Sequence, residues 1–369
     1  MLRHGRLQTP FWIYPLVRLA GTLALAVGGL GFHALFSDQL SDGSTAHAQS
    51  AAVSIAQRSD RAPAVLWRDP TVNQRGDLFY GPGGAAHQPD RQRTFTFVRE
   101  DLSGSHPKFE VRDDRSVRWK VKLGTEARPE TAATRIVWAA GYSADEDYFV
   151  DEIHVDGMPA HLHRGQRLVE GNGIVRNVRL ERILKDRTEI GSWAWRQNPF
   201  SGTRELNGLR VLMAIINNWD VKDINNGVYV TTKPESQDVV DAREFEVKDL
   251  GSTFGSTGLE RTDHTNGRLG TYRNTPFITR VTSQSVSFAT PARPDLIVFA
   301  NTPQFLRRLR LQWIGRDIPR SDAKWMGDVL AHIPQSQIRD AFRAGGYTPD
   351  EIDGFTAIIE SRIRQLSAL

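Results

Sequence analysis

Hydrophobic residues change their spacing along this chain, and that change limits the folds it can adopt. Residues 94–98, 108–111 and 117–123 mix β-branched, aromatic and polar side chains in short runs, which is typical of half-buried strands. Turn residues separate the runs, so three short antiparallel strands are predicted. Beyond Gly191 apolar residues recur mainly at helical spacing. The predicted fold class is therefore α+β, with a strand-rich part followed by a mainly helical part.

Helix signals follow the three predicted strands. Pro129 opens a run of helical spacing, at a position where its missing N–H costs nothing, and Gly141 ends that run. Further strands are predicted near residues 148–155 and 178–184. A second helix is predicted over residues 206–216, where apolar residues form one face.

Residues 323–369 predict two or three amphipathic helices. Thr348, Pro349 and Glu351 have the spacing of a capping box with proline at the first helical position. This pattern predicts that the last helix begins directly after Thr348.

These patterns divide the chain into four parts. Residues 1–48 predict a signal peptide or membrane anchor, and residues 49–92, rich in Ala, Ser, Pro and Gly, predict a flexible lead-in segment. Residues 93–190 form the strand-rich lobe. Residues 191–369 form the helical lobe.

The N-terminus predicts export. Arginines precede an apolar run over residues 19–36, and Ala46 and Ala48 supply the small residues of a signal peptidase site. Because the positive charge stays on the cytoplasmic side, we expect the rest of the chain to be periplasmic or extracellular. If cleavage after Ala48 does not occur, residues 19–36 anchor the protein to the inner membrane, and this segment is its only expected membrane contact.

Cysteine is absent from the sequence, which excludes disulfides, a cysteine nucleophile and a cysteine-ligated zinc site. The net charge of +4 arises from Lys and Arg that are scattered among acidic residues. No nucleic-acid partner is therefore expected. An exported domain without disulfides must be held together by its own hydrophobic core.

A polar segment follows the predicted helix 206–216. It contains Asp220, Lys222 two residues later and Asn225 five residues later. An Asp in such a loop can orient a hydroxyl group and accept its proton, a Lys can neutralise a transferring phosphoryl group, and an Asn can ligate a metal ion. These residue types at this spacing indicate phosphoryl transfer.

A second polar motif lies downstream. Residues 245–248 predict a strand that leads directly into Asp249. The carboxylate of Asp249 is suited to hold a magnesium ion that bridges nucleotide phosphates, because hard oxygen ligands suit that ion. Gly251 lets the backbone turn away tightly after it.

Asp-x-Lys-x-x-Asn at residues 220–225, followed by Asp-Leu-Gly at 249–251, resembles the catalytic loop and the metal-binding motif of the protein-kinase-like superfamily. The match is closest to its atypical branches, namely the HipA-type kinases, the phosphatidylinositol kinases and the secretory-pathway family that contains Golgi casein kinase and xylosylkinase. Asn218 and Trp219 replace the His-Arg that precedes the Asp in other kinases. The resemblance covers roughly residues 94–260.

The resemblance implies a two-lobed kinase-like fold that binds ATP with Mg²⁺ or Mn²⁺. The implied reaction transfers the γ-phosphoryl group to a hydroxyl of a protein, sugar or lipid acceptor, with Asp220 and Lys222 as catalytic residues. Asn225 and Asp249 are the implied metal ligands.

The resemblance also implies a lysine on the third strand that contacts the phosphates, and a glutamate on the next helix that pairs with it. Lys122 is the candidate lysine, and Lys120 is an alternative because it lies on the same strand face. Glu130 is the candidate glutamate and Glu126 the second choice. No Gly-rich phosphate loop is present, and the backbone amides of the turn around Gly104 are the candidate cover for the phosphates.

Three other interpretations compete with the kinase interpretation. A catalytically inactive pseudokinase or envelope scaffold is favoured by the missing Gly-rich loop. A metal-binding protein could use His161 and His163, which share a strand face. A calcium-binding EF-hand at residues 223–227 is excluded, because Val228 and Pro234 occupy positions that need Gly and Glu.

Overall fold

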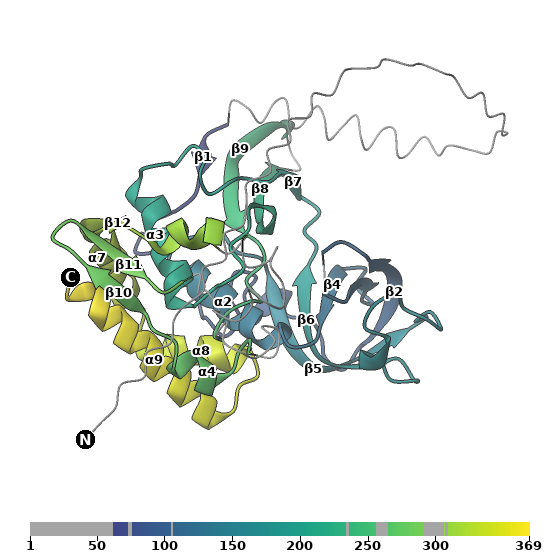
Figure 1. Cartoon of the computed structure of the whole chain (residues 1–369). Helices are drawn as coiled ribbons and strands as arrows, with labels where there is room; N and C mark the ends of the chain where they lie inside the picture. The colour runs from purple at the N-terminus through teal and green to yellow at the C-terminus, as the bar shows by residue number, and fades with distance from the viewer. Residues whose placement is uncertain are drawn as a thin grey trace, which may run out of the picture. The chain divides into compact units, whose positions relative to one another are not determined.

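A computed structural model describes residues 62–72, 76–104, 106–233, 236–255, 265–290, 306 and 309–369 (Figure 1). The segment predicted to direct export, residues 1–48 with its apolar run, lies outside the described residues. Within the described part of the chain, no helix is both long enough and apolar enough to cross a membrane.

Five strands close into a barrel that forms the strand-rich region (Figure 1). They are β2 (Thr94–Asp101), β3 (Lys108–Arg112), β4 (Arg118–Leu123), β5 (Asp147–Asp156) and β6 (Ile174–Arg182). The order is β2-β3-β4-β6-β5, and a parallel pairing between β2 and β5 closes the ring. Phe109, Val121 and Leu180 point inward and are fully buried, as the alternation of a barrel strand requires. The predicted strands over 94–123 are confirmed.

Helix α2 (Ala127–Ala139) connects β4 to β5. It begins two residues before Pro129, and Glu126 is its N-cap residue. Ala132, Ile136 and Val137 bury its apolar face in the larger of the two hydrophobic cores. The short link between β4 and α2 places the first turn of the helix beside the end of the strand.

A second sheet has the order β1-β9-β8-β7. Its strands are β1 (Ala64–Val65), β7 (Arg187–Gly191), β8 (Asn226–Lys233) and β9 (Ser236–Val247). β1 pairs in parallel with β9, and Leu66 and Leu78 are buried in the core. The sequence predicts a flexible lead-in over residues 49–92, but its described part includes strand β1 and the buried side chains of Leu66 and Leu78. Burial of these apolar side chains is favourable.

The remaining elements are helices, short strands and 3-10 turns. The helices are α3 (Arg204–Ile215), α4 (Leu269–Arg273), α7 (Arg320–Ala331), α8 (Gln335–Ala344) and α9 (Pro349–Ser367), and the short strands are β10 (Ile278–Val281), β11 (Ser285–Phe288) and β12 (Ile318–Pro319). Four 3-10 turns are η1 (Ala85–His87), η2 (Gln166–Leu168), η3 (Asp223–Asn225) and η5 (Gln312–Gly315). The region after Gly191, predicted to be mainly helical, therefore also holds strands β8 to β12. The fold is mixed, with strand-rich and helical regions.

Helix α9 fixes the end of α3. The predicted capping box is confirmed, since Thr348 accepts from the backbone N–H of Glu351 and the Glu351 side chain accepts from that of Thr348. Arg362 is buried, and its Nη1 donates to the carbonyls of Ala214 at 3.1 Å and Ile215 at 2.8 Å. These carbonyls belong to the last turn of α3, where the i+4 N–H partners of a helix interior are missing.

Candidate functional site

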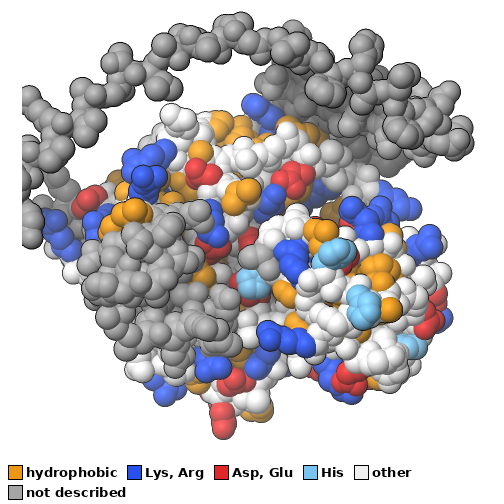
Figure 2. Space-filling view, turned by 45° about the vertical axis from the view of Figure 1, so that its right-hand side comes forward, with side chains coloured by type: hydrophobic (Ala, Val, Ile, Leu, Met, Phe, Trp, Pro, Cys, Tyr) orange, Lys and Arg blue, Asp and Glu red, His pale blue; other side chains and the backbone are white. Residues whose placement is uncertain are grey.

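A cleft of about 480 Å³ brings together residues from the barrel, from α2, from the segment after α3 and from the end of β9. Most of the residues that line it carry ionisable side chains. Figure 2 shows the same character on the surface, where acidic, basic and histidine side chains are interspersed on one face of the described chain. The site is therefore governed by charge.

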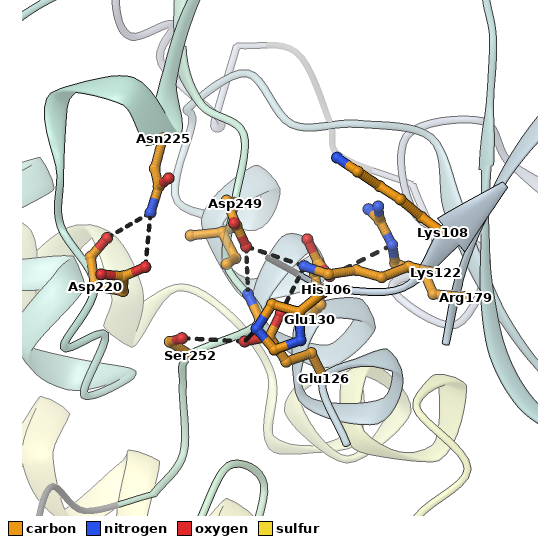
Figure 3. Close-up of polar contacts among 12 residues, drawn as sticks. His106, Lys108, Lys122, Glu126, Glu130, Arg179, Asp220, Asn225, Asp249 and Ser252 are labelled. Carbon is orange, nitrogen blue, oxygen red and sulfur yellow. Dashed lines mark hydrogen bonds and ion pairs between the residues drawn. The ribbon is translucent and has the colours of Figure 1, made fainter. Parts of the chain in front are cut away.

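Lys122 on β4 is the centre of the most buried part of this cleft (Figure 3). Its Nζ lies 2.7 Å from Glu126 Oε2, 2.9 Å from Glu130 Oε2 and 3.1 Å from Asp249 Oδ1. The two glutamates come from the N-cap and first turn of α2, and Asp249 follows the end of β9. Three separate segments thus place their charges around one ammonium group.

The charge states follow from burial and from the neighbours. Burial alone would lower the pKa of Lys122, but the carboxylates of Glu130, Asp249 and Glu126 raise it well above its usual range. Burial would raise the pKa values of Asp249 and Glu126, but Lys122 holds both below the usual range. Burial raises the pKa of Glu130 by more than Arg179 and Lys122 lower it, so this pKa rises to about 7.

The polar segment after α3 is folded around Asp220. Asn225 Nδ2 donates to the Asp220 carbonyl at 2.7 Å and to its carboxylate at 3.1 Å, and Lys222 Nζ lies 2.7 Å from that carboxylate. The backbone N–H of Trp219 donates to the Ser252 carbonyl at 3.3 Å. That bond holds the segment beside the turn that follows Asp249.

The structure places every predicted site residue at this cleft. Lys122, Glu130, Asp249, Asp220, Lys222, Asn225, Lys120 and Gly104 all line it. Both candidate glutamates contact Lys122, so Glu126, the second choice, belongs to the same cluster as Glu130. Lys120 also faces the cleft but pairs with a different carboxylate, Glu181, at 2.8 Å.

Sequence reasoning missed two residues of the cluster, His106 and Arg179. His106 Nε2 lies 3.0 Å from Glu126 Oε1; burial would lower its pKa, but Glu126 raises it. The sequence does contain one signal for His106, namely its position in the turn between β2 and β3. Arg179 lies 3.4 Å from Glu130 and 2.8 Å from Glu181. The contact with Glu181 is local, because the two residues lie two positions apart on β6. No local pattern identifies the contact with Glu130, because it depends on the register that places Arg179 opposite Lys122.

Oxygen ligands at the cleft fit a hard divalent cation. Among the described residues, one group of three potential ligands has its ligand atoms within 4.8 Å of one another, and it consists of Glu126, Glu130 and Asp249. The Lys122 ammonium already lies among these three carboxylates, and Asp249 is the most exposed of them, at 38%. The Asn225 amide nitrogen is committed to Asp220, which leaves its oxygen free for a cation. Carboxylate and amide oxygens suit Mg²⁺ or Mn²⁺.

The histidine alternative finds no support within the described residues. His163 pairs with Glu100 at 2.9 Å, and the one potential metal group there contains no histidine. A zinc site at His161 and His163 would need further ligands nearby.

No family model matches the chain, and no curated protein matches it significantly. Among solved structures the chain is similar to a Helicobacter pylori proinflammatory kinase, CtkA, with 11% sequence identity and a TM-score of 0.39. The match covers 74% of this chain and 96% of that chain. At this TM-score the likeness carries no argument about activity.

Proposed function

We propose that this protein is an atypical kinase that transfers the γ-phosphoryl group of ATP to a hydroxyl group of a protein, sugar or lipid. One observation carries the proposal. Lys122, Asp249, Asp220 and Asn225 come from three separate segments of the chain and line a single cleft. A phosphate-binding cation, two metal-ligating side chains and a carboxylate base are the parts that phosphoryl transfer needs.

Each group has a distinct role in this proposal. Lys122 binds the phosphates, and Glu126 and Glu130 keep its ammonium in place. Asp249 and Asn225 hold Mg²⁺ or Mn²⁺. The bound metal would neutralise charge on the phosphate oxygens.

Asp220 and Lys222 act on the reacting groups. The carboxylate of Asp220 orients the acceptor hydroxyl and accepts its proton. Asn225 and Asn218 fix that carboxylate and its backbone, since Asp220 N–H donates to Asn218 Oδ1 at 2.9 Å. Lys222, which lies against Asp220, is within reach of the transferring phosphoryl group and can neutralise it.

The test uses the full chain in mild detergent. Calorimetry measures binding of ATP with and without Mg²⁺, and labelled ATP measures transfer to a protein, a sugar and a lipid headgroup. Asp220→Asn should keep nucleotide binding and lose transfer by about 100-fold or more. Asp249→Asn should lose both. Asp151→Asn is the matched control, because Asp151 is 77% exposed on the barrel and far from these contacts.

Two outcomes would redirect the proposal. A wild-type protein that shows no metal-dependent nucleotide binding would exclude it. Nucleotide binding without transfer to any acceptor class would favour the alternative, a catalytically inactive scaffold with a kinase-like site.

A further inference from the structure

We infer that the cleft recognises its phosphoryl donor through the phosphate chain and makes little use of the nucleobase. The inference rests on the proposed function, and it identifies the part of the donor that the site recognises. Among the described residues that line the cleft, Ile224 and Tyr229 are the two with large apolar side chains, and the ionisable residues far outnumber them. A donor bound there meets charges over most of its length.

A nucleobase is usually held by stacking on aromatic or apolar faces. Ile224 is 74% exposed, so it covers little of the cleft. The guanidinium of Arg187 lies 3.8 Å from the centre of the Tyr229 ring and occupies one face of it. Neither residue provides the buried apolar sandwich that a base requires.

The cleft beyond Lys122 is occupied by paired charges. Lys120 stands two residues earlier on the same face of β4, and its Nζ lies 2.8 Å from Glu181 Oε1. The other oxygen of Glu181 lies 2.8 Å from Arg179 Nη2. A base that entered here would desolvate these ions without offering them an opposite charge, which is unfavourable.

The backbone at the end of β6 is also engaged. The N–H of Arg182 donates to the Glu146 carbonyl at 2.8 Å, and the N–H of Ile183 donates to the Arg118 carbonyl at 2.9 Å. These two amides are committed within the fold, and neither residue is among those that line the cleft. Phosphates, in contrast, find Lys122, Lys222 and the proposed metal ligand Asp249 in the cleft.

The experiment compares five magnesium complexes on the full chain: ATP, GTP, CTP, UTP and inorganic tripolyphosphate. Competition binding should give dissociation constants for the four nucleotides within about fivefold of one another, because a stacked base would be worth about 5- to 150-fold. Tripolyphosphate should bind within about tenfold of ATP. A larger preference for any one base, or a larger loss with tripolyphosphate, would overturn the inference.

A variant separates this inference from the proposed function. Ile224→Ala should change the dissociation constants of ATP and tripolyphosphate by the same factor, and a loss confined to ATP would show that the base is stacked on Ile224. If none of the five ligands binds, the proposed function itself fails. If ATP alone binds, the function survives and the inference fails.

A second observation concerns the turn between β2 and β3, and from it we propose that Arg164 is a positioning residue for the phosphate-covering backbone. Arg164 lies in the connection between β5 and β6. Its guanidinium donates to the carbonyls of Asp101 at 2.9 Å, Ser103 at 3.4 Å and Gly104. One side chain therefore fixes three carbonyls of a turn that has no Gly-rich motif.

Because the peptide bond is planar, these hydrogen bonds also determine the direction of the backbone N–H groups in the turn. In a trans peptide the C=O and the following N–H point in opposite directions. Carbonyls of Asp101 and Ser103 that face Arg164 therefore direct the N–H groups of Leu102 and Gly104 away from it. Ser103 and Gly104 line the cleft, and convergent backbone N–H groups are a common phosphate-binding device.

The connection is held close to the turn by two further contacts. Glu100 on β2 accepts the backbone N–H groups of His163 and Arg164, both at 3.0 Å. Gly165 has φ +75°, and a Cβ there would lie 2.6 Å from Pro107. Only glycine allows the backbone at residue 165 to approach Pro107 this closely, so Gly165 helps to fix the position of the neighbouring Arg164.

Two measurements on the full chain test this role. In Arg164→Ala, amide hydrogen exchange in the turn should accelerate about tenfold, because three hydrogen bonds are lost. The dissociation constants of Mg-ATP and Mg-tripolyphosphate should rise by the same factor, about three- to tenfold, and Arg164→Lys should lie between the variant and wild type. Arg176→Ala is the control, since Arg176 makes two ion pairs on the barrel surface.

The two readouts separate a positioning role from a structural one. Faster exchange with unchanged affinity for both ligands would show that the turn does not cover phosphates, and unchanged exchange would show that Arg164 does not hold it. Either result would overturn the proposal. The exchange measurement needs no ligand, so it remains informative if the proposed function fails.

Discussion

Lys120 and Lys122 share a strand and a face, yet their surroundings differ. The Lys122 side chain is 7% exposed and contacts three carboxylates, whereas that of Lys120 is 31% exposed and pairs with Glu181. The difference arises because α2 begins directly after β4 and brings its first turn to the second lysine only. Position relative to the helix, and not the residue type, decides which lysine joins the cluster with Asp249.

The largest expected effect comes from removing each lysine in turn. Lys122→Met leaves three carboxylates around an apolar group, so the free energy of unfolding should fall by about 3 to 5 kcal/mol. Lys120→Met leaves Glu181 with Arg179 and should cost about 1 kcal/mol. Urea denaturation followed by tryptophan fluorescence measures both. Equal losses would show that the two sites do not differ as described.

If Lys122→Met does not fold, a double variant keeps the comparison testable. Lys122→Met combined with Glu130→Gln removes one of the stranded carboxylates and should recover part of the lost stability. A double variant that also fails to fold, while Glu130→Gln alone folds, would argue against a shared cluster.

The two glutamates should also differ from each other. Glu126 is ionised and paired with Lys122, so Glu126→Gln should cost about 2 kcal/mol at pH 7. Burial raises the pKa of Glu130 to about 7, so it is partly neutral at that pH, and Glu130→Gln should cost less than about 1 kcal/mol. Thermal and chemical denaturation of the two variants tests the order, and the reverse order would contradict it.

Glu130 should also give the protein a pH dependence of opposite sign to that of a paired carboxylate. Between its ordinary pKa and about 7 the folded state holds a proton that the unfolded state has lost. Stability should therefore fall as pH rises from about 5 to 7, by at most about 1.4 kcal/mol per pH unit for one proton. Glu130→Gln should flatten this slope when denaturation is followed across the range. A slope unchanged in the variant would assign the effect to another group.

A further small effect concerns His106. Glu126 raises the pKa of His106, so the charged pair stabilises the fold at low pH and this contribution is lost as pH rises through the raised pKa. His106→Asn should cost about 1 kcal/mol at pH 6 and less at pH 9. Stability curves at the two pH values measure the difference, and an equal loss at both would mean that the contact is not charge-dependent.

Local patterns were enough to predict the barrel strands over 94–123, the capping box at Thr348 and eight of the residues that line the cleft, among them Lys122, Asp220 and Asp249. Strand alternation and capping depend on neighbours in the sequence, so they can be read from it. The spacing of Asp220, Lys222 and Asn225 is likewise local, because one short loop places all three.

Contacts that depend on the pairing of strands far apart in the sequence could not be predicted from it. Arg179 reaches the cluster because it stands opposite Lys122 in the pairing of β4 with β6, and no local pattern sets that register. The packed β1 strand is a similar case, since its partner is β9. Choosing between Glu126 and Glu130 required the orientation of the first turn of α2, which determines that both reach Lys122.

Arg362 on α9 bears on when this protein can finish folding. Its hydrogen bond to Ile215 spans 147 residues of sequence and closes the end of α3, directly before the Asn217–Asp220 loop. During synthesis, that loop leaves the ribosome long before α9 does. Contacts of such high sequence separation form late, so the end of α3 lacks this support while the intervening chain is made. A nascent chain that stops before α9 would carry every residue of the proposed site, and the bond from Trp219 to Ser252, without the contact from Arg362.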